Sequence, residues 1–153
     1  SGIERYEDPE LHHTAWGFSY DPVGLRYALQ RVHDRYPHIP LIITECGWSA
    51  NEELSVDGCI HDEVRLAYLN DHIYQLREAI RDGVNVIGFS PWSFIDLLSV
   101  NDGMEKRYGL VFVDRDNISE KEQKRYKKDS FHFYQEVIQT NAKNISALTD
   151  YVK

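Results

Sequence analysis

Apolar residues recur every three or four positions in three stretches of the chain, which is the period of an amphipathic α-helix. The first stretch opens at Asp21-Pro22, a carboxylate able to cap a helix followed by proline at the first helical position, and it ends at Pro37. The second covers residues 63–81, where Asp82-Gly83 closes it with a glycine suited to a left-handed cap. The third covers Lys124–Thr140. We therefore predict three helices.

Continuous apolar runs lie between these helices. Leu41-Ile42-Ile43 follows the first helix and Val84–Phe89 follows the second. Such short runs are typical of parallel strands that are buried on both faces. A third run, Leu110–Val113, predicts another short strand. The residues beyond Asn141 are polar, and we expect them at the periphery.

The order helix, strand, helix, strand, helix predicts an α/β protein with a parallel sheet. Two apolar strands cannot form a stable parallel sheet alone, because each exposes unpaired backbone groups along an edge. The pattern therefore also predicts that other strands belong beside them.

Charge and composition exclude several classes of partner. The 153 residues include 17 basic and 25 acidic ones, for a formal net charge of −8. Such a surface repels nucleic acid and anionic membranes, although an anionic small substrate can bind where basic groups gather. No apolar run approaches 20 residues, so no membrane span is predicted. Residues 1–5 do not show the charged and apolar regions of a secretory signal.

The two cysteines, Cys46 and Cys59, have no CxxC spacing and no clustered histidines near them. This spacing predicts neither a zinc site nor a disulfide framework. We interpret both as free thiols in a reducing compartment.

A carboxylate stands directly after the first predicted strand, in the segment Ile43-Thr44-Glu45-Cys46-Gly47. The carboxyl ends of strands are where an α/β barrel places its functional groups. The rigid strand would hold Glu45 in the position that attack on a sugar carbon requires. Taken alone, however, a glutamate here more often caps a helix or pairs with a surface lysine.

Two further segments carry side chains suited to a sugar or a phosphate. Trp92 follows the second predicted strand and can offer a flat surface to a sugar ring, although a buried core tryptophan is the commoner case. The segment Ser99–Tyr108 gathers hydroxyl groups and two cations, which are the groups that hold a phosphate. The alternative is a solvated loop in which Lys106 and Arg107 face water.

Together these segments resemble glycoside hydrolase family 1, a family of retaining β-glycosidases with a (β/α)8 barrel. Ile43–Gly47 resembles the family signature Ile-Thr-Glu-Asn-Gly, and Pro91–Asp96 resembles the segment after the eighth strand. The resemblance covers about residues 16–138. It implies that Glu45 is the catalytic nucleophile, that Trp92 contacts the sugar, and that the chain forms the last two to three βα units of the barrel.

The resemblance also indicates a substrate. Members that act on unphosphorylated sugars carry a glutamate where Ser99 stands, and that charge would repel a 6-phosphate. Members that act on 6-phosphoglycosides have this serine together with a Lys-Arg-Tyr run. The resemblance therefore implies that Ser99, Lys106 and Tyr108 bind the phosphate while Arg107 points elsewhere. Val100 favours glucosides, because phosphogalactosidases have tryptophan at that position.

The sequence departs from the family pattern in two respects. Cys46 replaces the usual asparagine, so the hydrogen bonds of that amide are lost. The acid/base glutamate, expected roughly 5–5.5 Å from the nucleophile, belongs to an Asn-Glu-Pro motif that this sequence lacks. Asn51-Glu52 is not assigned that role. A full barrel needs about 250 residues, so we expect residues 1–153 to be a partial catalytic domain, inactive alone, with a polar tail at about 141–153.

The resemblance thus implies a parent 6-phospho-β-glucosidase of carbohydrate metabolism, cytoplasmic and without a metal or organic cofactor. Its partner would be a phosphorylated β-glucoside, and a missing N-terminal half or another copy of the chain would cover the open barrel edges. Three alternatives stay open. They are a family member acting on plain β-glucosides or on 6-phosphogalactosides, a non-catalytic module that binds sugar phosphates, and a structural remnant without function.

Overall fold

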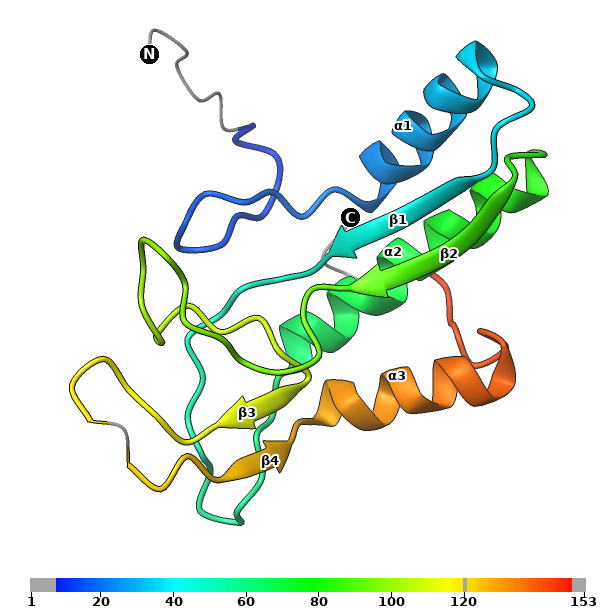
Figure 1. The fold of residues 1–153 in the computed structure, drawn as a ribbon. Helices are drawn as coiled ribbons and strands as arrows, with labels where there is room; N and C mark the ends of the chain where they lie inside the picture. The colour runs from blue at the N-terminus through cyan, green and yellow to red at the C-terminus, as the bar shows by residue number, and fades with distance from the viewer. Residues whose placement is uncertain (1–7, 120, 150–153) are drawn as a thin grey trace, which may run out of the picture.

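The computed structural model describes residues 8–119 and 121–149 (Figure 1). Its helices and strands, in chain order, are α1 (Pro22–Arg35), β1 (Leu41–Cys46), α2 (Glu63–Arg81), β2 (Val86–Pro91), β3 (Val111–Val113), β4 (Arg125–Lys127) and α3 (Asp129–Thr140). No helix within these described ranges is long and apolar enough to cross a bilayer.

The first two helices begin and end where the sequence predicts. The carboxylate of Asp21 accepts a hydrogen bond from the backbone N–H of Gly24 at 2.7 Å, which caps α1. Helix α2 has the predicted bounds, and Gly83 follows it with φ of 100°. The capping residues therefore located both helices correctly.

The predicted start of the third helix is wrong. Residues 125–127 form strand β4, which pairs antiparallel with β3, and α3 begins only at Asp129. Tyr126 lies opposite Phe112 in this pairing, with the two ring centroids 6.3 Å apart. A tertiary contact thus decides the conformation of a short charged segment whose local sequence suits a helix.

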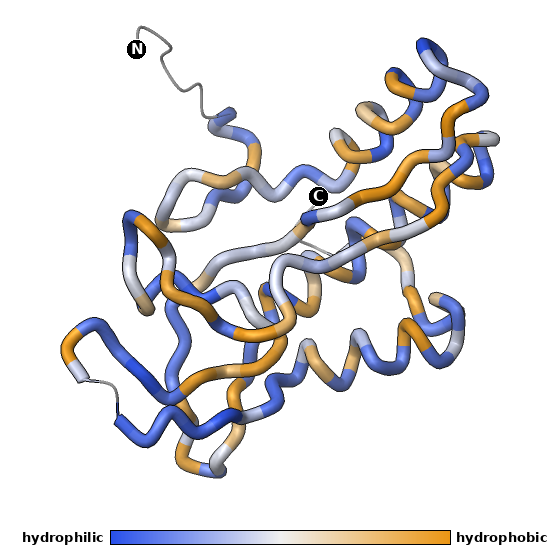
Figure 2. The backbone as a smooth tube through the Cα atoms, in the orientation of Figure 1, coloured by the Kyte–Doolittle hydropathy of each residue, from blue (hydrophilic) through white to orange (hydrophobic). Residues whose placement is uncertain are grey.

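Strands β1 and β2 form a parallel pair, as predicted, with Leu41 opposite Val86. One face of the pair packs against α1 and α2 through a cluster that includes Leu29, Leu76 and Ala79. The other face is open. Figure 2 shows hydrophobic residues along both strands, yet Ile42 is 57% exposed and Ile87 is 66% exposed. The prediction that both strands are buried on both faces is therefore wrong, because the helices in the described part of the chain cover one face.

The C-terminal segment is more integrated than expected. Ile145 is buried in a cluster with Leu69, Ile73 and Val137, so α2 and α3 pack together around it. The hydroxyl of Thr149 donates to the carboxylate of Asp71 at 2.6 Å. The expectation of a peripheral tail is wrong for these residues, and positions 150–153 lie outside the described part of the chain.

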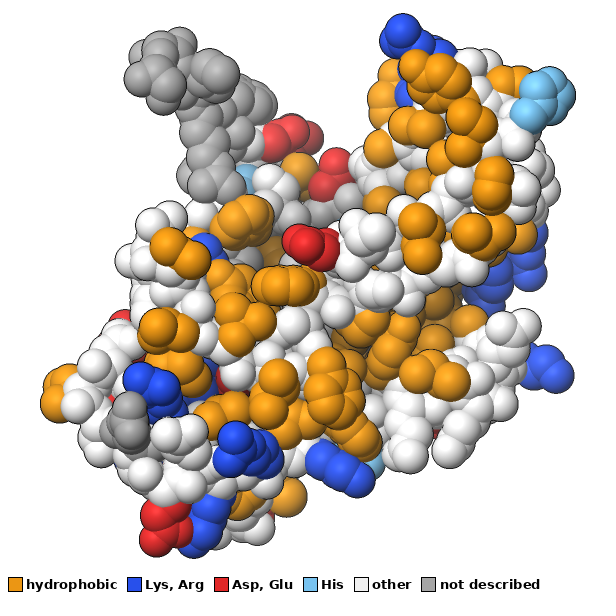
Figure 3. Space-filling model, in the orientation of Figure 1, with side chains coloured by type: hydrophobic (Ala, Val, Ile, Leu, Met, Phe, Trp, Pro, Cys, Tyr) orange, Lys and Arg blue, Asp and Glu red, His pale blue; other side chains and the backbone are white. Residues whose placement is uncertain are grey.

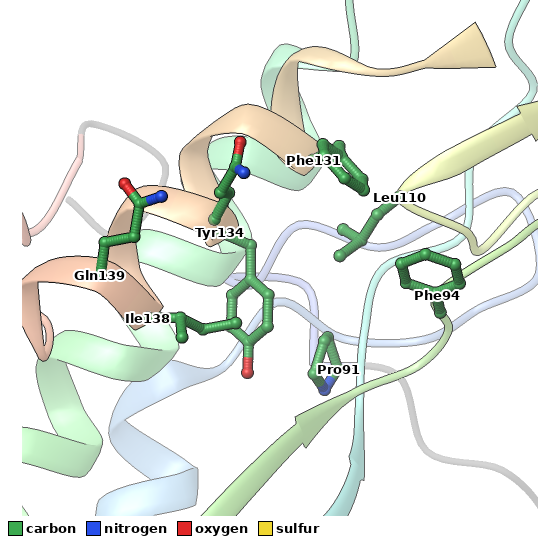
Figure 4. A pocket seen from close by; sticks show the side chains of 8 residues that line it. Pro91, Phe94, Leu110, Phe131, Tyr134, Ile138 and Gln139 are labelled. Carbon is green, nitrogen blue, oxygen red and sulfur yellow. The ribbon is translucent and has the colours of Figure 1, made fainter.

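An apolar groove of about 480 Å³ lies between α3 and the segments that follow β2 (Figure 4). Its apolar lining consists of Pro91, Phe94, Leu110, Phe131, Tyr134 and Ile138. Phe94 is 65% exposed and Ile138 is 67% exposed, and the space-filling view shows hydrophobic side chains gathered over this face (Figure 3). The molecule thus exposes two apolar surfaces, the groove beside α3 and the open face of the β1–β2 sheet.

Candidate active site

The carboxyl ends of β1 and β2 border a pocket of about 400 Å³. It is lined by Phe18, Glu45, Cys46, Gly47, Ser49, Tyr68, Trp92 and Tyr108. The fold therefore brings together three of the predicted site residues, Glu45, Trp92 and Tyr108, from segments far apart in the sequence. Adjacent parallel strands make this possible, because their carboxyl ends meet at one edge of the sheet.

A close backbone approach joins the two strand ends. The backbone N–H of Trp92 donates to the carbonyl of Cys46 at 3.0 Å, and the Trp92–Ser93 peptide bond is cis. A side chain at Gly47 would place its Cβ 1.9 Å from the carbonyl oxygen of Trp92. Only glycine tolerates this contact, so Gly47 allows the segment after Glu45 to lie against the segment that carries Trp92.

Glu45 and Trp92 are both available to a ligand. The side chain of Glu45 is exposed, and no donor among the described residues hydrogen-bonds its carboxylate. It neither caps a helix nor pairs with a lysine within that part of the chain. Trp92 is 39% exposed, with its ring edge-on to Tyr108 at a centroid distance of 6.5 Å. Neither residue fits the purely structural alternative.

Cys46 lines the pocket and packs against an aromatic cluster. Its thiol is 3.6 Å from the hydroxyl of Tyr68, and burial raises the pKa of Cys46 to about 11. Tyr68 packs with Tyr20 and Trp48, and burial raises the pKa of its phenol as well. Cys46 and Cys59 are free thiols, as predicted. The thiol of Cys46 and the phenol of Tyr68, which line the pocket with Glu45, are thus neutral at pH 7.

Ser99, Lys106 and Tyr108 lie together, linked by hydrogen bonds. The hydroxyl of Tyr108 donates to Ser99 Oγ at 3.2 Å, and Ser99 Oγ donates to Asp102 Oδ2, also at 3.2 Å. Lys106 Nζ donates to the same oxygen of Asp102 at 2.9 Å. Because Tyr108 also lines the pocket of Glu45, the cluster around Lys106 and the candidate nucleophile belong to one region.

Neither cation of the Lys-Arg pair faces water. Lys106 is 7% exposed, and its ammonium lies 4.8 Å from the ring centroid of Phe18. Arg107 points away from the pocket and donates to the carboxylate of Asp96 at 3.0 Å and to the carbonyl of Val113 at 2.9 Å. The solvated-loop alternative is therefore wrong for both residues.

A buried ionic network that the sequence analysis missed lies beneath the site. It contains three carboxylates and three cations, namely Glu52, Asp62, Asp96, Arg65, Arg107 and Lys128. Lys128 Nζ contacts Glu52 at 2.5 Å and Asp96 at 2.8 Å, and Arg65 also pairs with Glu52. The network joins the segment after β1 to the segment after β2. The network also includes Glu52, the glutamate of the only Asn-Glu pair in the sequence, which is ion-paired with Arg65 and Lys128.

The signal for this network was weak because its members are scattered. Arg65 donates to the carbonyl of Trp48 at 3.2 Å, and the carboxylate of Asp62 accepts from the backbone N–H of Ser130 at 2.9 Å instead of capping α2. Within residues 8–119 and 121–149, no group of three or more His, Cys, Asp or Glu side chains has a geometry that could hold a metal ion.

Comparisons with known proteins agree with this geometry. Aryl-phospho-beta-D-glucosidase BglA of Bacillus subtilis (strain 168) is 49% identical over 141 residues, which cover 91% of this chain and 29% of that protein. The 6-phospho-beta-glucosidase of Dickeya chrysanthemi is 44% identical over 145 residues, covering 94% and 31%. The structure of a beta-glucosidase from Thermotoga maritima in complex with glucoimidazole has a TM-score of 0.80 at 36% identity, covering 91% and 30%.

The chain therefore spans about 30% of the length of these relatives. The sequence model of Glycosyl hydrolase family 1 matches residues 1–143, which is nearly the whole chain. The parallel β1–β2 pair, the helices α1 and α2 on one of its faces, and the match to these structures show the C-terminal portion of a (β/α)8 barrel. The chain belongs to glycosyl hydrolase family 1.

Proposed function

We propose that this chain supplies the nucleophile and the phosphate-binding groups of a retaining glycosidase that cleaves 6-phospho-β-glucosides to glucose 6-phosphate and an aglycone or sugar. The observation that carries the proposal is the pocket at the ends of β1 and β2, where Glu45, Trp92 and Tyr108 converge. The names of relatives that are 49% and 44% identical support the phosphorylated substrate class.

In this proposal the carboxylate of Glu45 attacks the anomeric carbon while the bond to the leaving oxygen breaks. The leaving oxygen takes a proton from a second carboxyl group, and a water then releases the sugar from Glu45. That second carboxyl group comes from a part of the protein outside this chain. The exposure of Glu45 supports its role, because no donor within residues 8–119 and 121–149 holds the carboxylate away from a ligand. Trp92 offers its exposed ring to the sugar.

Ser99, Lys106 and Tyr108 are the proposed phosphate-binding groups. Lys106 supplies a positive charge, while the two hydroxyl groups supply hydrogen bonds. A serine at position 99 brings no charge of its own to the phosphate. Val100 lies at the tip of the turn and is 97% exposed. The hydrogen bonds that join the three groups support a common ligand.

We further propose that the chain is inactive alone and that either the remainder of a barrel or a second copy covers its open face. The exposure of Ile42 and Ile87 supports this, as does the apolar groove beside α3. The free thiols and the phosphorylated substrate support a cytoplasmic location for the whole protein.

The test uses the chromogenic substrate p-nitrophenyl 6-phospho-β-glucoside and its unphosphorylated form. The isolated chain should show no turnover, whereas a fusion to the part of BglA that this chain does not span should hydrolyse the phosphorylated form. Glu45→Gln should abolish turnover by the fusion, and Lys106→Ala should raise KM for the phosphorylated substrate alone. Glu53→Gln, in the loop that follows β1 and outside the pocket, is the matched control. Robust turnover by the fusion that carries Glu45→Gln would contradict the assignment of Glu45 as the nucleophile.

A further inference from the structure

The ammonium group of Lys106 is held in place by its surroundings without any ligand. Besides Phe18, the rings of Trp16 and Tyr108 lie within reach, with centroids 5.4 Å and 5.8 Å from Nζ. Aromatic faces attract a cation, so they fix the ammonium at this position. The anion paired with it is Asp102.

One oxygen of Asp102 collects the donors that we propose for the phosphate. Oδ2 of Asp102 accepts from Lys106 and from Ser99, and Tyr108 donates in turn to Ser99. A phosphate oxygen bound to Lys106 and Ser99 would need the same two donors. Asp102 therefore stands where the ligand would accept its hydrogen bonds.

We propose that Asp102 is an internal competitor of the substrate phosphate, a specificity-determining residue that a phosphate must displace from Lys106 and Ser99. This inference rests on the proposed function, since it takes the phosphate site at Lys106 as given. It adds a role for a carboxylate that the family resemblance does not include.

The charges favour competition over a positioning role. A phosphate monoester carries about −1.5 to −2 charges at pH 7, and the Lys106–Asp102 ion pair offers it no net positive charge. The rings of Phe18, Trp16 and Tyr108 already place the ammonium, and the hydroxyl of Tyr108 already contacts Ser99. Neither donor depends on Asp102 for its position.

The turn that carries Asp102 allows the side chain to leave without unfolding. Ser99 and Gly103 exchange two backbone hydrogen bonds of 3.0 Å and 3.1 Å, and Asn117 Oδ1 accepts from the backbone N–H of Met104 at 2.6 Å. The ends of the turn are therefore anchored. The side chain of Asp102 is 28% exposed, against 8% for Lys106. Rotation of one side chain toward solvent is sufficient to free both donors.

The test measures the dissociation constants of glucose 6-phosphate and glucose for the 153-residue chain by calorimetry at constant ionic strength. Asp102→Asn keeps the shape of the side chain and removes its charge. It should bind glucose 6-phosphate roughly tenfold more tightly than the wild type, because the neutral amide no longer holds the Lys106 ammonium in an ion pair. Affinity for glucose should not change. In the Lys106→Met background, Asp102→Asn should change the affinity less than about twofold.

Asp116→Asn is the matched control, since it removes the same charge from a nearby loop where Asp116 pairs with Lys121 at 3.5 Å. Equal or weaker binding of glucose 6-phosphate by Asp102→Asn would overturn the competitor role while leaving the proposed function intact. An unchanged affinity in the Lys106→Met single variant would overturn the proposed function itself. Absence of glucose 6-phosphate binding in every variant would overturn both.

Discussion

Cys46 lies directly after the candidate nucleophile, yet the structure predicts that its thiol is inert. Burial raises the pKa of Cys46 to about 11, so the reactive thiolate is scarce at pH 8. Cys59 is exposed in the loop between β1 and α2. Iodoacetamide at pH 8 should therefore label Cys59 at least about tenfold faster than Cys46, as measured by mass spectrometry of the labelled peptides.

A Cys59→Ser variant serves as the control for this prediction, because it leaves Cys46 as the single thiol. Its labelling rate should rise steeply as the pH approaches 11. Equal labelling of both thiols at pH 8 in the wild type would show that the contact between Cys46 and Tyr68 opens readily.

The burial of His72 predicts that the folded chain loses stability in mild acid. His72 is 4% exposed, its ring stacks on Tyr68 with the two ring centroids 3.7 Å apart, and burial lowers the pKa of His72 to about 4. Below about pH 6.5 the unfolded chain binds a proton that the folded chain excludes, so stability falls from pH 6.5 to pH 4 and the loss is complete below pH 4. A pKa shift of this size contributes about 3 kcal/mol to the free energy of unfolding at pH 7.

Urea unfolding at pH 7 and pH 4.5 measures this effect. The variant His72→Gln lacks the titrating group, so its stability should fall less between the two pH values than that of the wild type. His132, which lies on α3 outside this aromatic cluster, provides the control His132→Gln. The same pH dependence in His72→Gln and wild type would contradict the assignment.

Among the helices and strands, those with local capping signals were predictable. Asp21-Pro22 located the start of α1 and Gly83 located the end of α2, because these residues act on the backbone beside them. Strand β4 was not predictable, since Arg125–Lys127 is extended only through its pairing with β3. The site followed the same division. Glu45 and Trp92 were found at strand ends, whereas Lys128 contacts Glu52 and Asp96, which lie 76 and 32 residues away in the sequence.

Lys128 joins the elements on both sides of the site, so its removal should destabilise the fold. Lys128→Ala leaves Glu52 and Asp96 buried without their shared cation, and breaking a buried ionic group in this way costs about 3–5 kcal/mol. Lys124→Ala removes an exposed lysine that pairs with Glu122 at 2.5 Å and should change the free energy of unfolding by less than about 0.5 kcal/mol. Urea unfolding of both variants gives the comparison, and equal effects would contradict a central role for Lys128.

At the scale of the whole molecule, the sequence predicts that further strands belong beside β1 and β2, and within the described residues each of these strands has only the other as a neighbour. Local patterns mark Ile42 and Ile87 as core residues, but they do not say which chain segment covers them. Their exposure of 57% and 66% arises because none of the described residues forms a layer on the face opposite α1 and α2. The chain matches about 30% of each relative, and in a larger barrel of that kind other segments would cover this face.

This open face predicts self-association of the isolated chain. Exposed apolar surface on a sheet with unpaired edges favours pairing with another copy, although a net charge of −8 opposes it. Sedimentation should therefore show association that increases with concentration and with salt. The double variant Ile42→Thr, Ile87→Thr should reduce it without lowering stability, because both side chains lie on the open face. Val56→Thr, fully exposed in a loop, should leave association unchanged. If the chain is a monomer at every concentration and salt level, its open face stays exposed to solvent. That result would contradict the proposal that a second copy covers this face.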